Sequence, residues 1–155
     1  MVKMVKRISA VLLSLLLVLT LPAPCAFASE TQTEILYLED GSYIITTTEI
    51  YSTFTTTQVT AKKTKTHISF NGVTCWQAAL TGTFTYDGST AKCTASNIDI
   101  SIYADGWSTY QQTSGRAGNY CYANLIMRRT TATGIVADSV NCDITLTCDA
   151  NGNLS

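Results

Sequence analysis

The side chains best suited to chemistry are five cysteines, one histidine and a group of aromatic residues. The cysteines downstream of the N-terminal leader are Cys75, Cys93, Cys121, Cys142 and Cys148. In an exported protein, an odd number of cysteines leaves one thiol free or paired between molecules. Alternation along the expected strands turns four of these cysteines inward and Cys75 outward. Cys75 is therefore the expected free thiol.

Two disulfide pairings of the other four cysteines are compatible with strand geometry. Cys142 and Cys148 lie on one expected strand, ~20 Å apart along it, whereas a disulfide joins Cα atoms within ~7 Å. Either Cys121 pairs with Cys142 and Cys93 with Cys148, or the partners are exchanged. A hairpin through Thr130–Gly134 can place Cys121 opposite Cys142, which favours the first pairing. A strand register that differs by one or two residues would change both.

The signals for catalysis are weak. The only histidine, His67, lies between Lys65 and Ser69 on an expected exposed strand face. It could pair with Cys75 as a nucleophile and base, but such sites also need an orienting group in a cleft. A surface histidine beside a spare thiol is the simpler interpretation. No phosphate-binding glycine loop or zinc spacing is present, so we expect no cofactor, no metal and no enzyme activity.

The aromatic residues give the clearest indication of binding. Five of them are concentrated between Asn97 and Tyr122: Tyr103, Trp107, Tyr110, Tyr120 and Tyr122. Tyr120 and Tyr122 alternate with Cys121, so both are expected on the exposed face of their strand. Exposed aromatic rings stack on sugars or anchor protein partners. The five residues are the candidate binding site, with a cell-wall or host-surface glycan as the candidate ligand.

The N-terminal segment indicates where these side chains would act. Lys3, Lys6 and Arg7 precede a largely apolar run from 8 to 21, and Ala26-Phe27-Ala28 offers a small-x-small cleavage pattern. This order is typical of a secretory signal peptide, residues 1–28, cleaved after Ala28. The apolar run is shorter than the ~20 residues of a membrane span. Lipidation of Cys25 is an alternative, but Pro24 stands where a lipoprotein signal has a small residue.

The net charge and apolar content of the exported part limit the partners that we expect for it. It holds seven of the ten basic residues and all eleven acidic ones, which gives a net charge of −4. Phosphate binding requires a positive surface, so nucleic acid is not an expected partner. No second apolar stretch resembles a membrane span, so none is expected in the mature protein. Oligomeric state is not indicated by any pattern.

The rest of the chain has the pattern of an all-β domain. Thr-rich alternating runs are separated by Asn-Gly and Asp-Gly turns, and proline is absent after residue 24. The expected strands are Ser42–Tyr51, Lys62–Phe70, Thr74–Tyr86, Ala91–Thr94, Asn97–Tyr103, Trp107–Thr113, Asn119–Arg129 and Ile135–Cys148. Residues 29–38 are expected to be a flexible leader, and 39–155 an antiparallel β-sandwich of seven or eight strands. An immunoglobulin-like topology is one arrangement of these strands.

Three strands have one clearly apolar face. The three inward rows are Trp76, Ala78, Leu80, Phe84 and Tyr86; Cys121, Ala123, Leu125 and Met127; and Val140, Cys142, Ile144, Leu146 and Cys148. A bulged loop at Asn71–Gly72 would pair Thr66 with Trp76 and keep Ile68 inside. A two-residue turn at Asp87–Gly88 would pair Gly82 with Cys93. The opposite parity of Ile98 then requires a bulge near Ser96.

Several segments resemble a family of small secreted proteins from Gram-positive gut bacteria. They are the run from Trp76 to Thr94, Asp40–Ile44, Ser114–Asn119 and the last ten residues, Leu146–Ser155. The family has no assigned activity. The resemblance implies a secreted, all-β protein and a structural role for Cys93 and Cys148. We expect a non-enzymatic extracellular module; a secreted antagonistic protein of the bacteriocin type is the alternative, and a hydrolase ranks third.

Overall fold

The structure is a computed structural model that describes residues 29–52 and 57–155. The proposed signal peptide, the cleavage point after Ala28 and Cys25 lie outside the described residues. Within those residues, no helix is long and apolar enough to cross a membrane.

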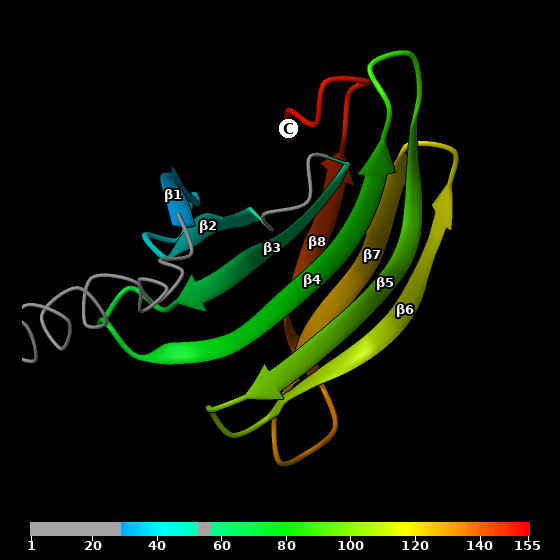
Figure 1. Ribbon diagram of the computed structural model, residues 1–155. Helices are drawn as coiled ribbons and strands as arrows, with labels where there is room; N and C mark the ends of the chain where they lie inside the picture. The colour runs from blue at the N-terminus through cyan, green and yellow to red at the C-terminus, as the bar shows by residue number, and fades with distance from the viewer. Residues whose placement is uncertain (1–28, 53–56) are drawn as a thin grey trace, which may run out of the picture.

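Eight antiparallel strands form two sheets packed as a β-sandwich (Figure 1). The strands are β1 (Ser29–Tyr37), β2 (Tyr43–Ser52), β3 (Gln58–Ile68), β4 (Thr74–Tyr86), β5 (Ala91–Ile102), β6 (Trp107–Ala117), β7 (Tyr120–Thr130) and β8 (Val136–Thr147). The order is β1-β2-β3-β4-β5 in one sheet and β6-β7-β8 in the other. The expected all-β sandwich is confirmed. Neighbours in each sheet are consecutive in sequence, so the described strands lack the Greek-key crossover of an immunoglobulin-like topology.

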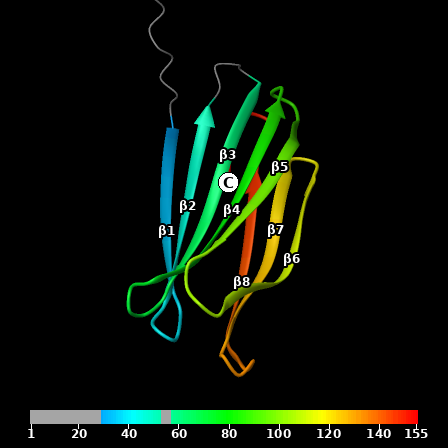
Figure 2. The same ribbon diagram turned by 90° about the horizontal axis from the view of Figure 1, so that it is seen from below.

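The core lies between β3–β5 and β6–β8. All three apolar rows expected from the sequence point inward, with only Tyr86 left partly exposed. Trp76, Phe84 and Cys121 are completely buried. The three-stranded sheet packs against β3, β4 and β5, and the larger sheet extends past it as β2 and β1 (Figure 2).

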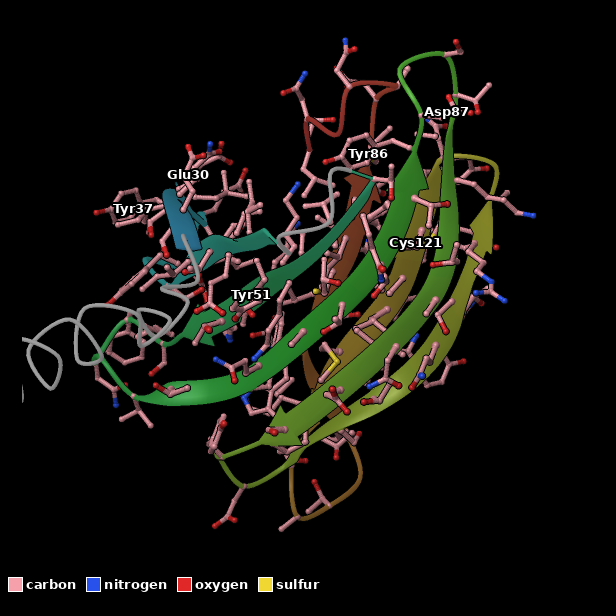
Figure 3. All side chains as sticks on the ribbon, viewed as in Figure 1. Glu30, Tyr37, Tyr51, Tyr86, Asp87 and Cys121 are labelled. Carbon is pink, nitrogen blue, oxygen red and sulfur yellow. The ribbon has the colours of Figure 1, made fainter. Side chains whose placement is uncertain are left out.

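The segment expected to be a flexible leader is instead an edge strand. β1 pairs with β2 from Ser29↔Tyr51 to Tyr37↔Tyr43. The side chains from Glu30 to Tyr37 are exposed, and Tyr37 is labelled at the free edge in Figure 3. The side chains of β1 show no pattern of core burial, so the sequence suggested a leader. What holds β1 in place is its ladder of backbone hydrogen bonds with β2.

The register between β3 and β4 differs from the expected one. Ile68 pairs with Thr74 as expected, but Trp76 pairs with His67 instead of Thr66, because Cys75 is an extra residue at a bulge. Lys63, Lys65 and His67 therefore share the face of Trp76. The prediction that this face is exposed is wrong, because a one-residue shift exchanges the two faces of a strand. Where β3 passes the β8 edge, Lys63 Nζ donates to Thr145 O at 3.1 Å.

The β4–β5 hairpin also has a different register. Phe84, not Gly82, lies opposite Cys93, because the loop spans residues 87–90 and is two residues longer than predicted. The expected bulge is present: the register shifts at Thr83/Phe84, opposite Thr94. It merges the two expected strands Ala91–Thr94 and Asn97–Tyr103 into β5. It also turns Ile98 and Ile100 toward the core.

Candidate ligand-binding face

Three of the five predicted aromatic residues share one surface. Tyr110, Tyr120 and Tyr122 lie on the outer face of the three-stranded sheet, which we call the tyrosine face. Trp107 is not part of it: its side chain is only 7% exposed and packs edge-on against Trp76, with 6.3 Å between ring centroids. Tyr103 is exposed but follows β5, where its backbone N–H bonds to Cys75 O. The placement of Trp107 in the binding site is wrong.

Strand alternation places Tyr120 and Tyr122 at one end of the tyrosine face. They flank the buried Cys121, so both rings point outward, with centroids 6.2 Å apart. Gly115 lies opposite Tyr122 in the β6–β7 ladder. A Cβ on Gly115 would lie 3.0 Å from the Tyr122 hydroxyl oxygen, so the glycine lets the ring lie close to the sheet. The pair presents aromatic surface along the sheet rather than away from it.

A bulge supplies the aromatic ring at the other end. The register shifts between Thr109 and Gln111, and Tyr110 is the extra residue. Its ring is 59% exposed, and Arg128 of β7 lies over it with the guanidinium carbon 3.2 Å from the ring centroid. Cation–π stacking of this kind holds both groups in place. Arg128 and Tyr122 are six residues apart on β7, so the two aromatic ends are separated by roughly 20 Å.

A shallow depression of about 310 Å³ lies between the two ends. Its lining comes from all three strands: Gln111, Asn124, Leu125, Ile126, Asn141 and Asp143. Asn124 lies opposite Asp143, and Ile126 lies between Gln111 and Asn141. Three amides offer hydrogen-bond donors and acceptors, and the carboxylate offers acceptors. Such groups can bind vicinal hydroxyls while the flanking rings stack on apolar ring faces.

Sequence analysis did not identify the polar part of this surface. Asn141 and Asp143 were recognised only as the exposed side of a strand, and Gln111 and Asn124 carried no signal. The available signal was alternation, since Asn124, Asn141 and Asp143 each flank buried residues, whereas Gln111 lies between two exposed ones. Their convergence follows from the register of three strands, which the sequence alone did not fix.

The structure does not support the predicted disulfides. All five described cysteines are free thiols and are buried. Cys121 lies opposite Leu146, and Cys142 lies opposite Leu125, so the predicted pair is offset by four residues along the ladder. Cys93 and Cys148 are not bonded either. The hairpin around Thr131–Ile135 fixes this register, and it was misjudged from the sequence.

Cys75, expected on an exposed strand face, is buried instead. The β3–β4 bulge buries it to 4% exposure, beside the equally buried Trp76. Two consecutive buried residues contradict simple alternation, and the bulge accounts for them. Its backbone carbonyl accepts hydrogen bonds from the N–H groups of Tyr103 and Ala104.

His67 belongs to a buried polar network that the sequence did not indicate. Its Nε2 lies 3.1 Å from Ser42 Oγ, and that hydroxyl donates to Asp40 Oδ1 at 2.6 Å. The ring stacks on Trp76, with centroids 5.3 Å apart. Burial lowers the pKa of His67, against the raising effect of Asp138 and Asp40. The hydrogen bonds from Ser42 hold the pKa of Asp40 below its ordinary value.

This network does not have the geometry of a nucleophilic site. The Ser42 hydroxyl points its proton at Asp40, and both Ser42 and His67 are 2% exposed, so a substrate has no access to them. Across residues 29–52 and 57–155, no group of three or more His, Cys, Asp or Glu side chains could hold a metal ion. The tyrosine face is therefore the best-formed candidate site.

Comparison of the chain with protein-family models, with curated proteins and with solved structures finds no match. Function is therefore argued from the site alone.

Proposed function

We propose that this protein is a secreted, non-enzymatic module that binds a glycan of the cell envelope or of a host surface through the tyrosine face. The observation that carries the proposal is the polar depression flanked by aromatic rings at both ends of one sheet face. Aromatic rings and polar groups together suit a sugar chain, because each sugar ring has apolar C–H faces that stack on aromatic rings and hydroxyl groups that form hydrogen bonds. The leader sequence supports an extracellular location.

The chemistry of the depression favours a neutral glycan over an anionic one. Its polar groups are three amides and the carboxylate of Asp143, with no cation in its lining, and Arg128 is stacked on Tyr110. A carboxylate would repel an acidic polymer at short range, whereas it accepts hydrogen bonds from neutral hydroxyls. Peptidoglycan and neutral mucin glycans thus rank above teichoic acids as ligands.

Retention of the protein on immobilised peptidoglycan, mucin and teichoic acid tests the proposal. Tyr122→Ala and Tyr110→Ala should each weaken binding roughly two- to tenfold, the equivalent of ~0.5–1.5 kcal/mol for a stacked ring. Asn124→Ala should weaken it by a similar factor through lost hydrogen bonds.

Tyr103→Ala is the matched control. Tyr103 and Tyr110 are both 59% exposed, but Tyr103 lies outside the tyrosine face, so its loss should leave retention unchanged. Equal effects of Tyr103→Ala and Tyr110→Ala, or no retention on any of the three polymers, would remove the glycan proposal. Inhibition of neighbouring bacteria by the purified protein would then favour the antagonistic alternative.

A further inference from the structure

Three cysteines meet at one end of the core, around the β6–β7 turn: Cys93 of β5, Cys121 of β7, and Cys148, which follows β8. Cys93 of β5 donates its backbone N–H to Gly118 O at 2.8 Å, and Cys148 donates its own to Asn119 O at 2.9 Å. The two cysteines therefore bracket consecutive residues of the turn. Cys121 follows two residues after Asn119, on the inward face of β7. The backbone itself thus holds Cys93, Cys121 and Cys148 close together.

Within this group, Cys121 is the cysteine whose sulfur reaches the sheet that carries Cys93. The Cys121 sulfur lies against the opposite sheet: a Cβ built on Gly82 of β4 would be 2.7 Å from it. Cys93 lies on the strand next to Gly82, opposite Phe84. Burial, together with the charge and side chain of nearby Cys93, raises the pKa of the Cys121 thiol to about 12. Figure 3 labels Cys121 where β7 passes behind β4 and β5.

We infer that Cys93 and Cys121 are joined by a disulfide between the two sheets, formed during folding in an oxidising compartment. The bond links β5 to β7, and its partners differ from both pairings that the sequence favours. In this structure both cysteines are free thiols, and the Cys93 thiol donates to Ala95 O at 3.3 Å, so the two sulfurs must move together for the bond to form. The inference does not depend on the proposed function.

The reaction uses a small disulfide such as cystine as the oxidant. The Cys93 thiolate attacks one sulfur of the reagent, which forms a mixed disulfide and releases one small thiol. The Cys121 thiolate then attacks the Cys93 sulfur and releases the second thiol. Two electrons pass from the protein to the reagent, and each cysteine loses one proton to solvent. Both steps precede complete burial, because the folded core excludes the reagent and disfavours the Cys121 thiolate.

Cys148 is the natural competitor. Burial raises the pKa of the Cys148 thiol, with smaller contributions from the charge of Asp149 and then that of Cys93. The last contribution places the Cys148 thiol near Cys93 as well. Cys121 is favoured because its sulfur lies against Gly82 of the sheet that carries Cys93, whereas the Cys148 thiol donates to Asp149 O at 3.4 Å.

Trypsin separates these alternatives, because Arg116 and Arg129 divide the cysteines among peptides. The protein, recovered from an exporting host, is reduced and unfolded, then refolded with cystine and cysteine, blocked with N-ethylmaleimide and digested. A disulfide between peptides 93–116 and 117–128 is the expected product. A bond from either peptide to the C-terminal peptide 130–155, which holds Cys142 and Cys148, would overturn the assignment, and so would five blocked thiols.

Two variants and a stability measurement complete the test. Cys142→Ala and Cys148→Ala should each keep the 93–116 to 117–128 bond, since neither residue takes part in it. Cys121→Ala should lose it. The oxidised protein should unfold at a higher temperature than the reduced one, and Cys121→Ala should show no such difference. Loss of the bond in a folded Cys148→Ala protein, checked by tryptophan fluorescence, would show that the bond depends on Cys148 and would overturn the assignment.

Discussion

At the scale of single residues, the most unusual group is a histidine held neutral in the core. His67 is enclosed by Trp76 and Trp107, and its Nδ1 is buried without a hydrogen-bond partner. A proton there would put a charge in an aromatic environment. The Ser42 hydroxyl satisfies only the other ring nitrogen. The site is therefore stable with the neutral imidazole and not with the imidazolium.

This environment predicts a loss of stability in mild acid. Burial lowers the folded-state pKa of His67. The stability that the neutral His67 side chain contributes is therefore fully present above pH ~6.5, the ordinary histidine pKa in an unfolded chain. It is lost as the pH falls from there through the lowered folded pKa, since the unfolded state then binds the extra proton. The urea midpoint should decrease between pH 7.5 and pH 5.

His67→Gln separates this effect from other titrations. Glutamine keeps a polar contact to Ser42 but does not titrate, so the variant should be less stable at pH 7.5 and should lose much of the pH dependence. An unchanged slope of stability against pH in His67→Gln would assign the effect to other groups. Asp40, whose pKa is lowered, contributes only at more acidic pH.

At the scale of strands, bulges determine which side chains share a face. One bulge buries Cys75 and turns His67 toward Trp76, and another brings Tyr110 onto the tyrosine face. A third lets β5 place both Cys93 and Ile98 toward the core. Between bulges, side chains alternate between the two faces of a strand as the sequence predicts. A bulge changes only which face the residues beyond it occupy. Bulges therefore explain the wrong placement of Cys75 and of the His67 face.

The close approach of the two sheets at Gly82 gives a prediction about packing. A methyl group there would lie 2.7 Å from Cys121 Sγ and 2.8 Å from Phe84 Cε2, and neither atom is free to move in a buried core. Gly82→Ala should therefore lower the free energy of unfolding by ~1–3 kcal/mol, as measured by urea denaturation.

A double-mutant cycle tests the cause. Cys121→Ala removes the closest atom, so Gly82→Ala should cost less in that background, with part of the loss remaining because of Phe84. The cycle is measured under reducing conditions so that no disulfide contributes. Strict additivity of the two substitutions would show that the sheets do not meet at this point.

At the scale of the whole molecule, the two sheets are unequal. The three-stranded sheet covers β3–β5, and the larger sheet continues as β2 and β1 (Figure 2). From Glu30 to Tyr37, β1 contributes no side chain to the buried core. Its apolar residues Ile35, Leu36 and Tyr37 are all more than half exposed. The sandwich is thus complete without its first strand.

Deletion of residues 29–37 should therefore preserve cooperative folding. We expect a small decrease in the urea midpoint and a slightly smaller slope, because less surface is exposed on unfolding. Phe84→Ala is the comparison, since loss of this fully buried ring should cost ~3–5 kcal/mol. A deletion variant that loses its sharp transition, or costs as much as Phe84→Ala, would show that β1 is integral to the core.

The amino-acid sequence by itself determined the all-β class, the approximate strands and the inward rows of β4, β7 and β8. It also placed Tyr120 and Tyr122 outward around Cys121. These features depend on alternation within one strand, which is a local property with a period of two residues. The edge strand β1 was missed because its side chains are exposed and carry no burial pattern.

Only the tertiary structure decided the register between strands, and with it the neighbours of each functional group. It brought His67 to Trp76, Trp107 into the core, and Gln111, Asn124, Asn141 and Asp143 into one depression. It also brought Cys93, Cys121 and Cys148 to one end of the core, and it offset Cys142 by four residues from Cys121, its predicted partner. The physical reason is that a bulge of one residue exchanges the two faces of a strand, and the packing of distant segments decides where that bulge lies.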